Sequence, residues 1–189
     1  MQSLITEYYT FILTPSISLL TTALPPKDSP SPHAIAAFLS VLRALTTSFT
    51  TDTRDFWTSP VHFNQLSPVL LSSLSLIPLS PLLAIPLTTA IVELASSCAS
   101  SEDQLKAINT TVLKAMRSES VEVRLAAVKV EIKLYEKMGE EWLGLLPETV
   151  PYIAELLEDD SEEVERETQR LIGKVEEFLG EGELQGMLQ

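Results

Sequence analysis

The strongest constraint on the fold of this chain is an internal repeat with a constant offset of 41 residues, as from Val123 to Val164. The segment SVEVRLAAVKVEIKLYEKMG (120–139) aligns with SEEVERETQRLIGKVEEFLG (161–180), and apolar, acidic and glycine positions coincide. The residues upstream of each segment follow the same offset. A repeating unit of this length that contains two helices is typical of HEAT and armadillo proteins.

Apolar residues recur at helical spacing along most of the chain, whereas the alternation typical of strands is scarce. We therefore expect an all-α protein with about eight helices. Helices that stack in pairs form an α-solenoid, and we therefore predict an α-solenoid of HEAT-type helical hairpins. Their expected ranges are 3–23, 33–50, 60–76, 81–99, 102–117, 119–138, 147–158 and 161–179.

We expect residues 1–189 to form a single HEAT-repeat solenoid segment. Residues 101–139 are one HEAT-like repeat and residues 140–189 a terminal one. Within residues 1–100 the hairpins are inferred from helix lengths alone, including a third copy near residues 60–99, and PPKDSPSP (25–32) reads as a linker.

Two apolar stripes run along the predicted helix 119–138, one through Val123 and one through Val128. A helix with two apolar sides is packed on both of them, as inside a stack. The predicted helix 161–179 has mainly one stripe, formed by Val164, Leu171, Val175 and Phe178. This pattern predicts a C-terminal capping repeat, at which the solenoid ends.

Composition excludes several classes of site. All six glycines follow residue 138, so the earlier chain cannot supply a glycine-rich phosphate loop. One cysteine, Cys98, rules out an internal disulfide framework. The apolar stretch 66–99 is cut by four prolines and contains Glu93, so it does not read as a membrane span. The N-terminal residues lack the pattern of a secretory signal.

The net charge of −13 is concentrated in residues 101–189, which hold ten basic and twenty-one acidic residues. Nucleic-acid binding depends on Lys and Arg contacts to phosphates, so we expect no direct nucleic-acid binding by this segment. The acidic surface fits either a basic protein partner or a purely solubilising role.

The densest charge lies between Glu155 and Glu165, where seven of eleven residues are acidic. These acids can stabilise the positive end of the following helix dipole, or they can contact a partner. A calcium loop would need alternating oxygen ligands and a glycine at the turn, and this segment has neither. The candidate partner-binding residues are Glu158, Asp159, Asp160, Glu162, Glu163 and Glu165.

No pattern predicts a catalytic residue, a metal site or a cofactor. His33 and His62 lie in different predicted helices, and neither has the neighbouring partner that a general base needs. Cys98 reads as a packed thiol. Arg124 is predicted to pair with the acids of the neighbouring repeat's turn.

Trp57 and Trp142 each precede a predicted helix, in what we expect to be loops. Each is either a plug between helix pairs or an aromatic anchor for a partner.

The segment LLPETVPYIAELLEDDSEEVERETQRLIGKVEEFLGE and the upstream VRLAAVKVEIKLYEKMGEEWLGLLPE resemble the C-terminal end of a known family. This is the family of the large HEAT-repeat protein of the small-subunit processome, also called the HEAT repeat-containing protein one family. The resemblance covers residues 101–189, whereas residues 1–100 do not match closely. It implies that this chain is the C-terminal part of a longer protein.

The resemblance further implies a non-catalytic scaffold segment in ribosome biogenesis, located in the nucleolus of the nucleus. Such a segment would act in small-subunit processome assembly and pre-18S rRNA processing. Its expected partners are other processome proteins, with the pre-rRNA ribonucleoprotein contacted only indirectly and no membrane or small-molecule substrate. The alternative is a HEAT-repeat adaptor in nuclear transport or trafficking that binds a basic peptide.

Overall fold

The computed structural model describes residues 2–24, 30–51 and 54–188, and all regular secondary structure in these ranges is helical. The long helices are α1 (Gln2–Thr22), α2 (Pro32–Thr50), α4 (Pro60–Ser72), α5 (Ala84–Ser97), α6 (Glu102–Met116), α7 (Val121–Met138), α9 (Leu146–Leu156) and α10 (Glu162–Leu179). Shorter elements are α3 (Arg54–Trp57), α8 (Glu140–Leu143), α11 (Glu183–Met187) and the 3₁₀ helices η1 (Ser73–Leu79) and η2 (Pro81–Leu83). The expected all-α fold is confirmed.

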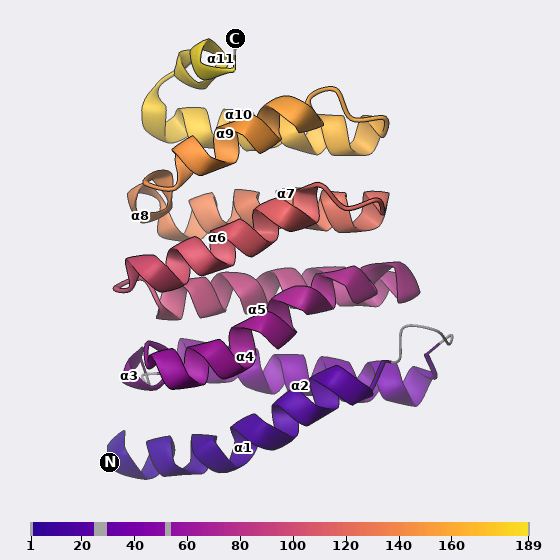
Figure 1. The fold of residues 1–189 in the computed structure, drawn as a ribbon, viewed down its shortest axis with the longest axis vertical. Coiled ribbons are helices and arrows are strands. Elements are labelled where there is room, and N and C mark those ends of the chain that lie inside the picture. The colour runs from indigo at the N-terminus through magenta and orange to yellow at the C-terminus, as the bar shows by residue number, and fades with distance from the viewer. Residues whose placement is uncertain (1, 25–29, 52–53, 189) are drawn as a thin grey trace.

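The long helices form two layers that rise together from the N-terminus to the C-terminus (Figure 1). Helices α1, α4, α6 and α9 follow one another in one layer, and α2, α5, α7 and α10 follow one another in the other. Each helix packs on its counterpart in the next hairpin. The fold is therefore an α-solenoid, and α4 with α5 supplies the hairpin near residues 60–99. The assignment of each hairpin to the HEAT type stays a prediction.

Two predicted helices were too long, and prolines explain why. The stretch 60–76 is α-helical only to Ser72 and continues as η1, which contains Pro78. Helix α5 begins at Ala84 because Pro81 opens the separate turn η2. A proline lacks the N–H group that an α-helix needs at an interior position, so the chain takes a tighter path between the two helices.

Helix α7 is covered on two sides, as its two apolar stripes predict. It packs against α5 on one side and α10 on the other, and α6 of its own hairpin also contacts it. Val123 and its repeat equivalent Val164 are both buried. The residues of α7 that are buried include Ala127, Val128, Val130, Ile132, Leu134 and Tyr135. Burying an aliphatic side chain of this size contributes about 1.5–3 kcal/mol.

Helix α10 buries one stripe, but Phe178 does not belong to it. Val164, Leu171 and Val175 are buried, whereas Phe178 is 39% exposed. Its ring closes over Gly139 at the end of α7, where an added Cβ would lie 3.3 Å from Phe178 Cε1. Gly139 also has φ of +57°, which a side chain would disfavour. The short helix α11 then packs on α10 and buries Leu184.

The two tryptophans lie in the short helices α3 and α8 rather than in loops. Trp57 is 1% exposed and Trp142 is fully buried, so both act as plugs, and neither is an anchor for a partner. Trp57 stands edge-on against Phe49 and Phe56. The indole Nε1–H of Trp142 donates a hydrogen bond of 2.9 Å to Glu131 Oε2 in α7.

Residues 25–29 of the predicted linker lie outside the described residues. In the described part of the chain, none of the helices combines the length and the apolar character that crossing a membrane requires.

The two-sided packing of α7 predicts that Val123→Asp destabilises the fold strongly. The new carboxylate would be buried without a partner, so we expect the free energy of unfolding to fall by more than about 3 kcal/mol. Val61→Asp is the matched control, because Val61 is 64% exposed. It should change stability by less than about 0.5 kcal/mol. Urea unfolding followed by circular dichroism measures both, and equal effects would show that the face of α7 is wrongly assigned.

A second prediction concerns pH. Burial raises the pKa of Glu131 from its ordinary 4.5 to about 7, against the opposing effect of the Trp142 bond. Between these values the folded state keeps a proton that the unfolded state has lost. The stability that this carboxyl contributes is therefore fully present below about pH 4.5 and is lost as the pH rises through about 7.

Glu131→Gln keeps an acceptor for Trp142 and does not ionise. Between pH 5 and pH 8 the wild type loses the contribution of Glu131, whereas the variant does not. We therefore expect the free energy of unfolding of the variant, minus that of the wild type, to increase by about 2–3 kcal/mol over this range. Denaturant unfolding at a series of pH values measures this difference. A difference that is constant with pH would contradict the protonation of Glu131 in the folded state.

Candidate interaction surface at the turn between α9 and α10

The turn before α10 has the same local chemistry as the turn before α7. Asp159 Oδ1 accepts the N–H of Ser161 at 2.9 Å, and Ser118 Oγ accepts the N–H of Ser120 at 3.3 Å. Both side chains bond a backbone group two residues ahead, which fixes the turn that opens the next helix. The repeat offset therefore extends to this turn bond, in which a carboxylate replaces a hydroxyl in the second copy.

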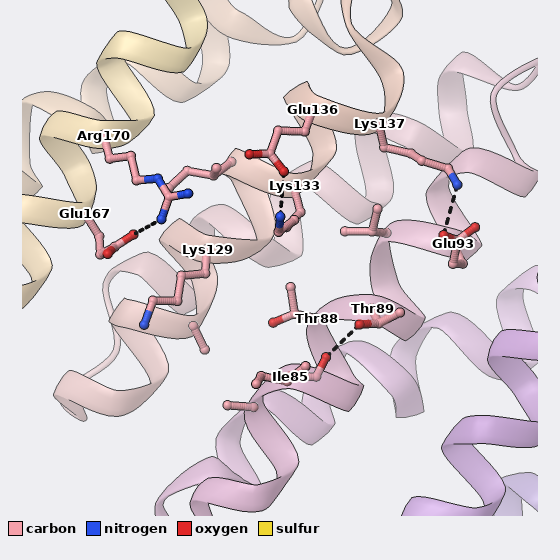
Figure 2. A pocket seen from close by; sticks show the side chains of 14 residues that line it. Ile85, Thr88, Thr89, Glu93, Lys129, Lys133, Glu136, Lys137, Glu167 and Arg170 are labelled. Atoms are coloured by element: carbon pink, nitrogen blue, oxygen red, sulfur yellow. Dashed lines mark hydrogen bonds and ion pairs between the residues drawn. The ribbon is translucent and has the colours of Figure 1, made fainter.

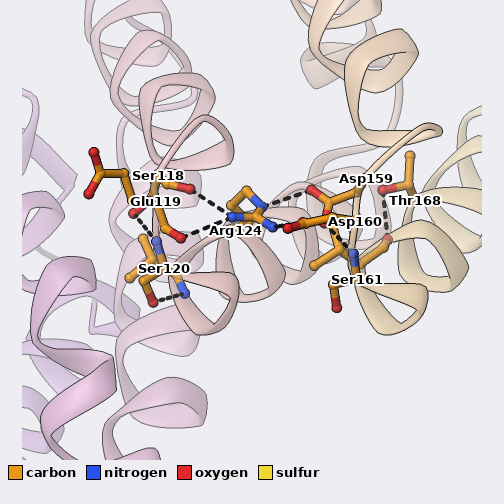
Figure 3. A network of polar contacts seen from close by, with 10 residues as sticks. Ser118, Glu119, Ser120, Arg124, Asp159, Asp160, Ser161 and Thr168 are labelled. Atoms are coloured by element: carbon orange, nitrogen blue, oxygen red, sulfur yellow. Dashed lines mark hydrogen bonds and ion pairs between the residues drawn. The ribbon is translucent and has the colours of Figure 1, made fainter.

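Arg124 of α7 joins these two turns (Figure 3). Its Nε and Nη2 donate to Asp159 at 2.7 and 2.8 Å, and Nη2 also donates to Asp160 at 2.6 Å. Its Nη1 donates to the carbonyl oxygens of Ser118 and Glu119 at 3.0 and 3.2 Å. A guanidinium has five N–H donors, and this one makes five hydrogen bonds. The predicted pairing of Arg124 with the neighbouring acidic turn is confirmed.

The Arg124 contact settles the role of Asp159. Its side chain is only 6% exposed, and the hydrogen bonds from Arg124 hold its pKa below the usual value, with the Ser161 N–H acting in the same direction. Both carboxylate oxygens are used within the molecule. Little of the Asp159 side chain is therefore open to a partner, and its contact with one stays a prediction. Asp160 shares the guanidinium but is 86% exposed.

The other candidate acids lie on the surface. Glu158 follows α9, and Glu162, Glu163 and Glu165 lie in the first turn of α10. All four are exposed, and Glu163 lies 3.9 Å from Lys129 of α7. Acids in a first helical turn stabilise the helix through its dipole. Contact between these side chains and a partner stays a prediction.

A second ion pair joins the same hairpins from the other layer. Arg117, at the end of α6, donates from Nε to Glu155 Oε2 at 2.7 Å and from Nη2 to the other oxygen of Glu155. Its guanidinium also lies over the ring of Tyr152, 4.1 Å from the centroid. Because both charged side chains are about half exposed, this contact orients the two helices more than it stabilises them.

The histidines and the cysteine have structural surroundings. His33 is exposed at the start of α2. The ring of His62 stacks on Phe56 at 3.8 Å, and its Nδ1 donates to the Phe56 carbonyl oxygen at 2.9 Å. Burial raises the pKa of the Cys98 thiol to about 11. Among the described residues, no cluster of three or more His, Cys, Asp or Glu side chains is arranged to hold a metal ion.

A groove between α5, α7 and α10 is a surface feature that the sequence pattern did not predict. The available signal was the spacing of Lys129, Lys133 and Lys137, which places three cations on one face of α7.

The geometry of Arg124 predicts a large effect of its removal. In Arg124→Ala the mostly buried Asp159 loses its cation, so we expect the free energy of unfolding to fall by about 2–4 kcal/mol. Asp160→Asn is the control, because this exposed residue should contribute less than about 0.5 kcal/mol. Thermal unfolding at pH 7 compares the two variants. Similar small losses in both would mean that Arg124 does not hold the two turns together.

No known family model matches the chain. Among curated proteins, the U3 small nucleolar RNA-associated protein 10 of Phaeosphaeria nodorum is 48% identical over 150 residues, which are 79% of this chain and 9% of that protein. The protein of the same name in Neurospora crassa is 40% identical over 190 residues, covering 100% of this chain and 10% of that protein. The Schizosaccharomyces pombe protein is 38% identical over 185 residues, or 97% of this chain and 10% of that protein.

These matches extend the relationship beyond the part of the chain that carries the resemblance in sequence. They cover nearly the whole chain, so residues 1–100 are related to the same proteins as residues 101–189. The chain spans about a tenth of the length of the curated relatives that it matches. The chain belongs to the U3 small nucleolar RNA-associated protein 10 family.

Proposed function

We propose that this chain is a non-catalytic scaffold segment in ribosome biogenesis. In this proposal it acts within the small-subunit processome in the nucleolus, where it supports processing of the pre-18S rRNA. Its contacts are with proteins, and the RNA is reached through them. The observation that carries the proposal is the similarity of nearly the whole chain to proteins named for association with the U3 small nucleolar RNA.

The architecture supports a scaffold role. Stacked hairpins place successive helices side by side, so their outer faces form one extended surface on which several partners can bind. The inter-repeat contacts of Arg124 and Arg117 hold neighbouring hairpins in a fixed relation. A surface of this kind is suited to positioning partners relative to one another.

Charge supports protein contacts over direct RNA contacts. The net charge of −13 repels phosphates, whose binding requires a concentration of Lys and Arg. Exposed carboxylates at the start of α10 are suited to basic side chains instead. The same carboxylates favour the second candidate, an adaptor in transport or trafficking that recognises a basic peptide.

The proposal is tested by affinity purification from nuclear extract with the tagged 189-residue chain as bait. We expect recovery of U3 small nucleolar RNA, measured by quantitative reverse transcription against a spliceosomal RNA, together with processome proteins identified by mass spectrometry. Val123→Asp is the control for folding, and it should lose both. Recovery of transport receptors or coat proteins without U3 RNA would replace the scaffold proposal with the adaptor.

A further inference from the structure

A groove of about 490 Å³ crosses the layer formed by α5, α7 and α10. Figure 2 shows side chains of α5, among them Ile85 and Thr88, facing the lysines of α7 across it. Arg170 and Glu167 of α10 line its far side. The groove is lined by three successive hairpins, so it exists only in the stacked molecule.

The groove lining holds four cations and three carboxylates, so it carries a net charge of +1. Four of the ten basic residues of 101–189 line it, but only two of the twenty-one acidic ones, Glu136 and Glu167. Glu93 of α5 is the remaining acid in the lining. The most acidic part of the chain thus has a local excess of cations here. Such an arrangement is complementary to an acidic ligand.

The cations are held in ion pairs that a ligand can replace. Lys133 bonds Glu136 at 2.6 Å within α7, and Lys137 bonds Glu93 at 3.0 Å between α7 and α5. The side chains of Lys129, Lys133 and Lys137 are 44–56% exposed, and that of Arg170 is 63% exposed. The partner carboxylates Glu136 and Glu93 are 29% and 18% exposed, so the lysines are the members of these pairs that a ligand carboxylate can reach.

The spacing of the lysines matches a helix. Successive residues among Lys129, Lys133 and Lys137 are four positions apart, or about 6 Å along the axis of α7. A partner helix lying beside α7 with an acid at every fourth position would meet each lysine in turn.

Apolar surface lies beside the cations. Val92, Ala126 and Ile132 form buried floor positions, while Ile85 at the edge is 79% exposed. The Glu93–Lys137 pair also lines a second hollow, of about 240 Å³. This second hollow continues from the groove toward the end of α2. The groove therefore offers an apolar contact flanked by positive charge over more than one helical turn.

We propose that this groove binds an acidic amphipathic helix of a partner protein. Its carboxylates pair with Lys129, Lys133 and Lys137, and an apolar side chain packs on Ile85. This site rests on the proposed scaffold function and specifies the chemistry of one of its partners. RNA fits the groove less well, because no aromatic side chain is present in its lining for base stacking.

The test uses a displayed library of random 16-residue peptides selected against the folded 189-residue chain. We expect the selected peptides to be rich in Asp and Glu with apolar residues at helical spacing. Their dissociation constants are then measured by fluorescence anisotropy against the wild type and two double variants. Lys129→Glu with Lys133→Glu reverses the groove charge, and Lys106→Glu with Lys114→Glu makes the same change on α6, outside the groove lining.

The groove variant should weaken binding at least about tenfold and the α6 variant less than about twofold. Ile85→Ser provides a second measurement, because this exposed residue can be replaced without loss of the fold and should still weaken binding. Failure to select acidic peptides, or equal losses in the two double variants, would overturn the proposal. The proposal would also be overturned if a 20-nucleotide single-stranded RNA bound more tightly than the peptides and lost its binding in the groove variant.

The two experiments distinguish failure of the groove proposal from failure of the scaffold proposal. Loss of peptide binding with U3 RNA still recovered from extract would remove the groove and leave the scaffold role. Peptide binding without U3 RNA recovery would keep the acidic-helix site and remove its assignment to ribosome assembly.

Discussion

The burial of α7 between α5 and α10 is the contact on which the rest of the molecule depends. The helix is apolar on two sides, and each side completes the core of a different neighbour. Neither the hairpin α6–α7 nor the hairpin α9–α10 could cover its apolar residues alone, because each leaves one stripe bare. Stacking is therefore the condition for folding, and every surface discussed above is a consequence of it.

Acidic residues are used in two ways in this structure. At the turn before α10, Asp159 stands in place of Ser118, keeps the bond that fixes the turn, and adds a charge that Arg124 reaches from the preceding hairpin. In α10 the position equivalent to Arg124 is Glu165, which is exposed. The charge density of the turn is thus partly structural, and the exposed carboxylates around it are what remains for recognition.

Much of the fold was predictable from local pattern. Helical periodicity and the repeat offset located the long helices, and the position of Arg124 predicted its partners. Two helix bounds were wrong because prolines interrupt the helices locally. Elsewhere a contact distant in sequence decided the outcome, as where Phe178 leaves the stripe of α10 to cover Gly139. The groove was missed for the same reason, since its lining comes from three helices that only stacking brings together.

Because it is covered on two sides, α7 should be the helix held most firmly by its neighbours. Amide hydrogen exchange measured by NMR on the folded chain tests it most directly, because exchange in a covered helix requires opening of the whole stack. We expect amides in the middle of α7 to exchange slowest, with protection equal to the global free energy of unfolding, while those of α11 exchange much faster. Exchange in α7 as fast as in α11 would contradict it.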